Sequence, residues 1–192
     1  MPIALVVRLV FWLWFAAALV VGQQRLLQRL SPPAVQGVLF GLTALLLLAY
    51  FRLAALRAWV DALDLRALLR LHLLRFVGIY FLVLYRRGEL PYAFAVPGGY
   101  GDIVVATLAL PIMFLSLDPA RRTRAITIWN VIGFTDILLI VLTAIRINLT
   151  DPAQLRELLV LPLSLLPTLM VPLIIATHVV IFVRLSRASR PV

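Results

Sequence analysis

Residues 86–102 read RRGELPYAFAVPGGYGD and separate two long apolar segments. This stretch holds two Pro and four Gly, which disfavour a helix because Pro lacks an N–H and Gly has a large backbone entropy to lose. The apolar segment that follows, residues 102–117, would span only ~24 Å as a helix, less than a ~30 Å hydrocarbon core. We therefore expect an ordered external loop at 86–102 that dips into a membrane to complete that crossing.

The composition around this stretch is that of a membrane protein. Hydrophobic residues make up 64% of the 192 residues, and the mean hydropathy is +1.07. The net charge of +10 comes from Arg residues in short links between apolar segments, a pattern of membrane topology and not of nucleic-acid binding. The chain has no Cys, which excludes disulfides and thiolate chemistry, and all 18 basic residues are Arg, which excludes a retinal Schiff base.

Six apolar segments are long enough to cross a bilayer. They lie at residues 3–21, 34–51, 68–85, 102–117, 125–147 and 159–183. Ser31, Asp118 and Asp151 each precede Pro, the pattern of a helix N-cap followed by the first helical residue. The last segment contains Pro162, Pro167 and Pro172, which predict a kinked or broken helix. The expected fold is an all-α bundle of six transmembrane helices, forming one integral membrane domain over residues 1–192.

Residues 52–70 have helical composition and place Arg57, Asp61 and Asp64 on one face. This pattern fits an interfacial amphipathic helix with Trp59 at headgroup level, and it also fits a surface that docks a partner.

The distribution of Arg predicts the orientation of the six spans. Ten Arg lie on the side of the termini and six on the other, which favours a multi-pass protein of the inner (plasma) membrane with both termini in the cytoplasm. The ten are Arg52, Arg57, Arg66, Arg70, Arg121, Arg122, Arg124, Arg184, Arg187 and Arg190, against Arg25, Arg29, Arg86, Arg87, Arg146 and Arg156.

Polar side chains inside the apolar segments are the candidates for function. Asp136 is expected near the middle of the fifth segment, and Asn130 and Gly133 precede it at steps of three residues. Arg75 in the third segment lies at a depth from which its side chain can reach Asp136. Such a cluster either pins helices together or lines a path for a solute or protons. Asp102 follows the glycines directly and is expected to cap the fourth helix, with membership of the polar cluster as the other reading.

His72 and His178 are the two histidines of the chain, and both are expected toward the cytoplasmic end. A helical bundle can hold a haem b between two such ligands, with Arg75 near a propionate. The sequence predicts no metal site, and neither Ser116 nor Ser164 forms a convincing nucleophile and base pair with a histidine.

Four short motifs carry a resemblance to known sequences: RFVGIYFLVLY, GELPYAFAVPGGYGD, WNVIGFTD and LPTLMVPLIIATH. Together they resemble an uncharacterised family of small bacterial membrane proteins with about six spans. The resemblance covers about residues 71–178 and implies no activity. It groups Arg75, Asp102, Asn130, Asp136 and His178 into one assembly.

The leading expectation is a non-enzymatic membrane protein that allows a small solute or protons to permeate through the polar cluster. The alternatives are an accessory or assembly subunit of a larger membrane complex and a bis-His haem b electron carrier. The expected partners are the lipid bilayer and a second copy or a larger complex, without nucleic acid. No cofactor is predicted apart from the haem alternative.

Overall fold

The computed structural model describes residues 1–188, and these residues form helices and no strand. Six helical stretches are long and apolar enough to cross a membrane, in agreement with the expected number. Their bounds are Ile3–Gln23, Pro32–Arg52, Leu65–Arg86, Tyr92–Phe114, Pro119–Thr150 and Leu166–Arg187. The Arg counts remain a prediction of orientation, and Arg190 lies outside the described residues.

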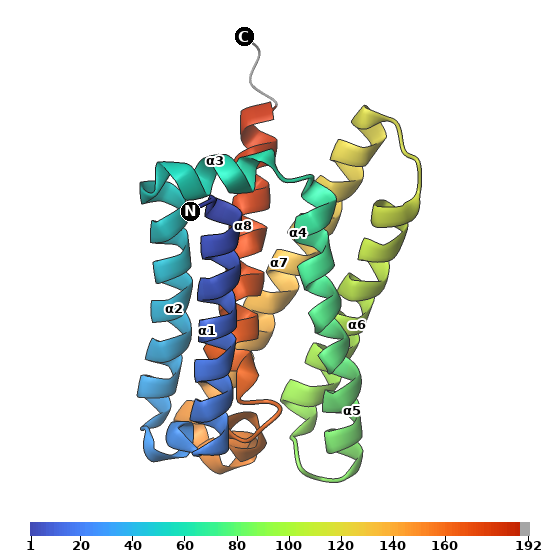
Figure 1. Cartoon of the computed structure of the whole chain (residues 1–192). Helices are drawn as coiled ribbons and strands as arrows, with labels where there is room; N and C mark the ends of the chain where they lie inside the picture. The colour runs from blue at the N-terminus through green and yellow to red at the C-terminus, as the bar shows by residue number, and fades with distance from the viewer. Residues whose placement is uncertain (189–192) are drawn as a thin grey trace. The chain divides into compact units, whose positions relative to one another are not determined.

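The chain divides into two compact units. The first unit consists of Met1–Leu63 and Ile147–Ala176, and the second consists of Asp64–Arg146 together with the C-terminal segment that begins at Thr177. Figure 1 shows the helices of both units by their labels, and each unit is described by itself below.

The first unit contains three helices from the N-terminal part of the chain, α1 (Ile3–Gln23), α2 (Pro32–Arg52) and α3 (Ala54–Ala62). The 3-10 helix η1 (Leu26–Arg29) links α1 to α2. The later part of the chain adds the 3-10 helix η3 (Pro152–Leu159), the π-helical segment η4 (Leu166–Met170) and the start of α8 (Val171–Ala188). Pro172 has no N–H for the carbonyl of Thr168, and the indole Nε1 of Trp14 donates to that oxygen at 2.9 Å.

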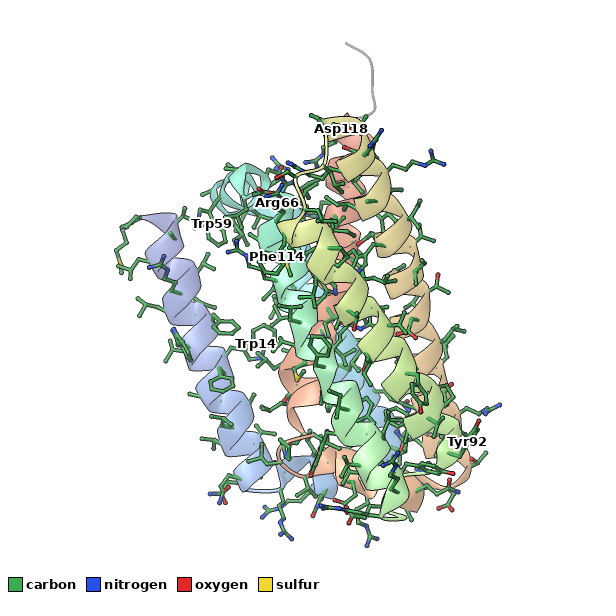
Figure 2. All side chains as sticks on the ribbon, turned by 90° about the vertical axis from the view of Figure 1, so that its right-hand side faces the viewer. Trp14, Trp59, Arg66, Tyr92, Phe114 and Asp118 are labelled. Atoms are coloured by element: carbon green, nitrogen blue, oxygen red, sulfur yellow. The ribbon has the colours of Figure 1, made fainter. Side chains whose placement is uncertain are left out.

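The second unit contains α4 (Leu65–Leu71), the 3-10 helix η2 (His72–Val77), α5 (Gly78–Arg86) and α6 (Tyr92–Phe114). Most of α7 (Pro119–Thr150) and the end of α8 complete it. Tyr92 and Phe114 mark the two ends of α6, and Asp118 lies at the start of α7 (Figure 2). Asp118 caps α7 as expected, because its carboxylate accepts a hydrogen bond from the backbone N–H of Arg121 at 2.9 Å.

The expected loop at 86–102 is wrong, since α6 is continuous from Tyr92 to Phe114 and only residues 87–91 link it to α5. Pro97, Gly98, Gly99 and Gly101 all lie inside the helix. Helices that cross membranes tolerate Pro and Gly better than soluble ones, because neighbouring helices restore the lost interactions. The 23 residues of α6 extend over about 34 Å, enough for a ~30 Å core, so no re-entrant loop is needed.

Two local expectations on either side of α2 also need correction. Ser31 precedes α2 and its two prolines as predicted, but its side chain forms no capping hydrogen bond.

The amphipathic helix at 52–70 is broken, because α3 ends at Ala62 and Asp64 caps α4 by accepting from the N–H of Arg66 at 2.9 Å. Asp61 instead accepts a hydrogen bond from Tyr50 Oη at 2.8 Å. Arg57, Asp61 and Asp64 therefore do not share one helix face.

The proline-rich last segment is broken as predicted, although it begins later than residue 159. Residue 160 forms a bend and residues 161–164 form turns, residues 166–170 are π-helical, and regular α-helix begins at Val171. A local π-helical turn is one way in which a helix satisfies backbone groups that a proline leaves without a partner.

Candidate functional site

Arg75, on η2, is fully buried in the second unit and is the centre of the site. Its Nε donates to Asp102 Oδ1 on α6 at 2.6 Å, and its Nη1 donates to the carbonyl oxygen of Gly133 on α7 at 2.9 Å. Its Nη2 donates to Asp136 Oδ2, also on α7. We call Arg75, Asp102 and Asp136 the ion cluster, which joins three helical elements through one guanidinium.

Glycines bring these elements close enough for the ion cluster to form. A Cβ atom at Gly101 of α6 would overlap the carboxylate of Asp136. A Cβ atom at Gly78 would overlap the backbone oxygen of Gly99 and lie 2.9 Å from Asp102 Cβ. Gly98, Gly99 and Gly101 of α6 therefore serve helix packing, and this close approach offsets their low helix propensity.

The two carboxylates of the ion cluster differ in exposure. The side chain of Asp102 is 6% exposed and that of Arg75 is 0% exposed, whereas that of Asp136 is 23% exposed. Two carboxylates facing one guanidinium leave a net negative charge when both are ionised. Asp136 is thus the member of the ion cluster whose carboxylate is partly accessible, while Arg75 and Asp102 are enclosed.

A second polar group, the histidine layer, consists of His72, Asn130, Thr177 and His178, all of them buried. Asn130 binds His178 twice: its Nδ2 donates to the backbone oxygen at 3.1 Å, and its Oδ1 lies 2.8 Å from the ring Nδ1. Because Oδ1 accepts, Nδ1 of His178 carries the hydrogen, and a neutral His178 has an unshared lone pair on Nε2. His72 Nε2 lies 3.1 Å from Thr177 Oγ1.

The rings of the two histidines contact each other directly. Their centroids are 4.3 Å apart, and the indole of Trp129 packs against both, at 4.8 Å from His72 and 5.5 Å from His178. His72 Nδ1 and His178 Nε2 have no hydrogen-bond partner within the part of the chain that the structure describes. A buried ring nitrogen without a partner is costly, so these two atoms are suited to binding a water molecule.

The contact between the two rings bears on whether the histidine layer could hold a cofactor. A porphyrin lies between its two axial ligands, so His72 and His178 could ligate a haem only after their touching rings separate. Within residues 1–188, no three His, Asp or Glu side chains are grouped so that they could hold a metal ion.

Comparison with known proteins shows the family of this chain. Residues 32–186 match the model of a domain of unknown function (DUF8737). The chain belongs to this family. No curated protein and no solved structure matches it. The match includes the second apolar segment, whereas the resemblance seen in the sequence began at about residue 71. The match also covers the ion cluster and the histidine layer.

The structure brings together the residues that the sequence singled out. Arg75 and Asp136 form the expected pair, and Asn130 and His178 are hydrogen-bonded beside them. The expected capping role of Asp102 is wrong, because this residue lies in the middle of α6 and binds Arg75. Thr177 and the full burial of His72 were not foreseen. Neither is signalled by hydropathy, since His72 follows Arg70 closely and threonine is common in apolar helices.

The contacts of Asn130 predict the effect of its removal. We expect Asn130→Ala to lower the free energy of unfolding by about 2 kcal/mol, because the ring Nδ1 and the backbone oxygen of His178 both lose a buried partner. Urea unfolding in detergent measures the change. Asn148→Ala is the control, because Asn148 lines an open pocket at the end of α7, and an equal loss in both variants would contradict the prediction.

Proposed function

We propose that the chain is a non-enzymatic multi-pass membrane protein that allows protons, alone or with a small solute, to permeate through the ion cluster. The exposure of Asp136 carries this proposal. A cluster that only pinned helices together would gain from complete burial, yet one of its carboxylates is about a quarter exposed while its partners are buried. Ionisable groups at such depth in apolar helices are costly and usually functional.

The arrangement of polar groups in the second unit supports the same proposal. Asp136 contacts Arg75, and Arg75 contacts the carbonyl of Gly133. A Cβ atom at Gly133 would lie 3.1 Å from Nε2 of His178, so the unpartnered nitrogen faces this glycine. His178 in turn contacts His72. Polar or titratable groups thus follow one another from a partly exposed carboxylate to a buried pair of histidines.

Replacing Asp136 by Asn tests the proposal. In proteoliposomes with a trapped pH-sensitive dye and an imposed potassium diffusion potential, we expect proton flux in Asp136→Asn to fall to that of protein-free vesicles. Asn cannot exchange a proton but still offers an acceptor to Arg75, so the fold should persist.

Asp118→Asn is the matched control, because it makes the same chemical change at the N-cap of α7, outside the ion cluster. It should keep the flux of the unmodified protein. Equal flux in the unmodified protein and in Asp136→Asn would refute the proposal, as would the absence of any flux above protein-free vesicles.

The exposure of α1 favours a second candidate function, an accessory subunit of a larger membrane complex or homo-oligomer. Only Ala18 and Gly22 of α1 are buried, while Trp12 and Leu13 are 61% and 71% exposed. A partner helix could cover this face. In that case native mass spectrometry from a mild detergent would show a complex whose mass falls when Trp12 and Leu13 are both replaced by Ala, and Asp136→Asn would leave the complex intact.

The contact between the two histidine rings leads to a separate prediction about haem binding. Because the rings of His72 and His178 touch, we expect the purified protein, expressed with ample haem, to show no Soret band before or after reduction by dithionite. A Soret band that disappears in His178→Ala would reverse this expectation and show that the rings separate around a haem.

A further inference from the structure

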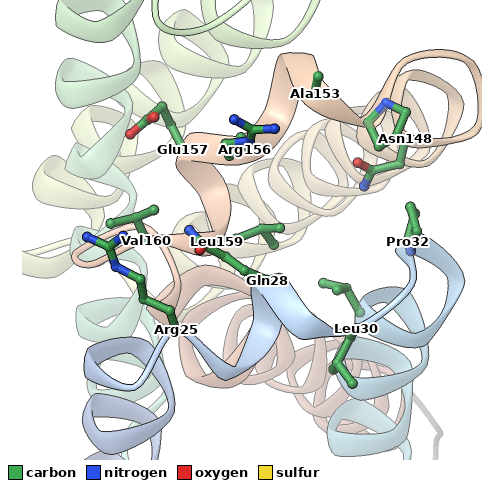
Figure 3. Close-up of a pocket in the computed structure, with 12 residues that line it drawn as sticks. Arg25, Gln28, Leu30, Pro32, Asn148, Ala153, Arg156, Glu157, Leu159 and Val160 are labelled. Atoms are coloured by element: carbon green, nitrogen blue, oxygen red, sulfur yellow. The ribbon is translucent and has the colours of Figure 1, made fainter.

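A pocket of ≈ 790 Å³ in the first unit lies among the segments that link its helices. Arg25 and Gln28 line it from the link between α1 and α2, and Arg156 and Glu157 line it from η3 (Figure 3). Two Arg against one Glu give the lining a positive charge. Neither Arg forms an ion pair within the described residues, so both guanidinium groups are available to an anion.

An apolar cleft of ≈ 280 Å³ adjoins this pocket, and Leu30 lines both. The cleft runs between α1 and α2, with Trp14, Ala18 and Val21 on one side and Val38 and Leu42 on the other. Trp14 precedes the end of α1 at Gln23 by about 14 Å of helix, which is close to half of a ~30 Å hydrocarbon core. A charged pocket and an apolar cleft thus meet at Leu30.

The backbone of Arg25 adds an independent observation. Its φ of 52° places it in the left-handed region directly after the C-cap of α1, a position that usually holds Gly. Arg is strained in this conformation, whereas Gly is not. Strained residues of this kind concentrate at binding sites, where the side chain is needed despite the backbone cost.

We propose that the pocket and the cleft together bind one anionic glycerophospholipid. The phosphate group lies between Arg25 and Arg156, because guanidinium groups bind phosphate with paired, charge-assisted hydrogen bonds. One acyl chain fills the cleft beside Trp14. This site belongs to the first unit and is independent of the ion cluster. Like the proposed function, it requires that the helices lie in a membrane.

Quenching of Trp14 tests the proposal on the full chain. The protein in neutral detergent is titrated with phosphatidylglycerol that carries brominated acyl chains, and the fluorescence difference between the unmodified protein and Trp14→Phe isolates the signal of Trp14. Brominated phosphatidylcholine serves as the zwitterionic comparison. We expect phosphatidylglycerol to quench Trp14 at about tenfold lower concentration, because the choline of phosphatidylcholine adds a positive charge beside Arg25 and Arg156.

Two single variants and one control locate the binding residues. Arg156→Gln should abolish the preference for phosphatidylglycerol. Arg25→Gly should do the same while leaving the unfolding temperature unchanged or higher, because Gly relieves the strained backbone; this separates lost binding from lost folding. The double variant Arg29→Gln/Arg87→Gln removes the same total charge as the two single variants combined, outside the pocket, and should keep the preference.

Three results would overturn the proposal. The first is equal quenching by the two lipids, and the second is loss of the preference in the control variant, which would show a general effect of surface charge. The third is full displacement of the lipid signal by glycerol 3-phosphate, which would assign the pocket to a soluble phosphate ester.

Discussion

Replacing Arg75 by Gln should lower the free energy of unfolding by about 3–5 kcal/mol, because breaking a buried ion pair leaves charges without compensation. Asp102 would keep its buried position on α6 and lose the donor that lies 2.6 Å away. Asp136 would lose its bond to the same guanidinium, and the carbonyl of Gly133 would lose a donor as well. Chemical unfolding in detergent micelles, followed by tryptophan fluorescence, measures this loss.

A triple variant provides the control for this prediction. Arg75→Gln/Asp102→Asn/Asp136→Asn removes every charge of the ion cluster while keeping side chains of similar shape that can hydrogen-bond to one another. The triple variant leaves no buried charge without compensation, which is the main cost of removing one partner of a buried ion pair. The triple variant should therefore recover most of the lost stability. A triple variant as unstable as Arg75→Gln alone would show that the arginine stabilises the unit through packing and not through charge.

The second large effect is expected at the contact between α5 and α6. Gly78→Ala should lower the free energy of unfolding by about 1–3 kcal/mol or more, the usual cost of overpacking. The added Cβ would overlap the backbone oxygen of Gly99, and a backbone atom cannot move aside as a flexible side chain can. Because Asp102 lies on the same stretch of α6, separating the helices would also stretch its bond to Arg75.

Gly41→Ala is the matched control for Gly78→Ala. Gly41 lies inside α2, and a Cβ atom there would meet nothing within 4 Å. Ala at this position should raise stability by roughly 0.5–1 kcal/mol, because Ala loses less backbone entropy in a helix. Thermal unfolding of both variants in the same detergent compares them. A similar loss in both would indicate that glycines are required throughout these helices for a reason other than close packing.

Most of the architecture could be predicted from local patterns. The six apolar segments follow from hydropathy and length, which are properties of each segment alone. The caps at Asp118 and Asp151 follow from a residue type beside a proline, and both carboxylates accept the expected backbone hydrogen bonds. The pairing of Arg75 with Asp136 could be predicted because buried charges need partners and the chain offers few at that depth.

The errors arose where a local pattern was outweighed by contacts between distant parts of the chain. Pro97, Gly98, Gly99 and Gly101 disfavour a helix locally, yet α6 is continuous through them. The position of Asp102 after these glycines predicts a capping role, but the helix extends past Asp102 and its side chain binds Arg75 instead.

The sequence alone thus determined the family, the six apolar helices and the small set of polar residues inside them. Each of these follows from the composition of single segments, because the free-energy cost of exposing or burying a segment depends on its own residues. Only the tertiary structure decided how those residues are combined. The continuity of α6, the three partners of Arg75 and the contact between His72 and His178 all depend on how closely helices approach. That distance is set by the absence of side chains at Gly78, Gly101 and Gly133, a property of pairs of helices that no single segment contains.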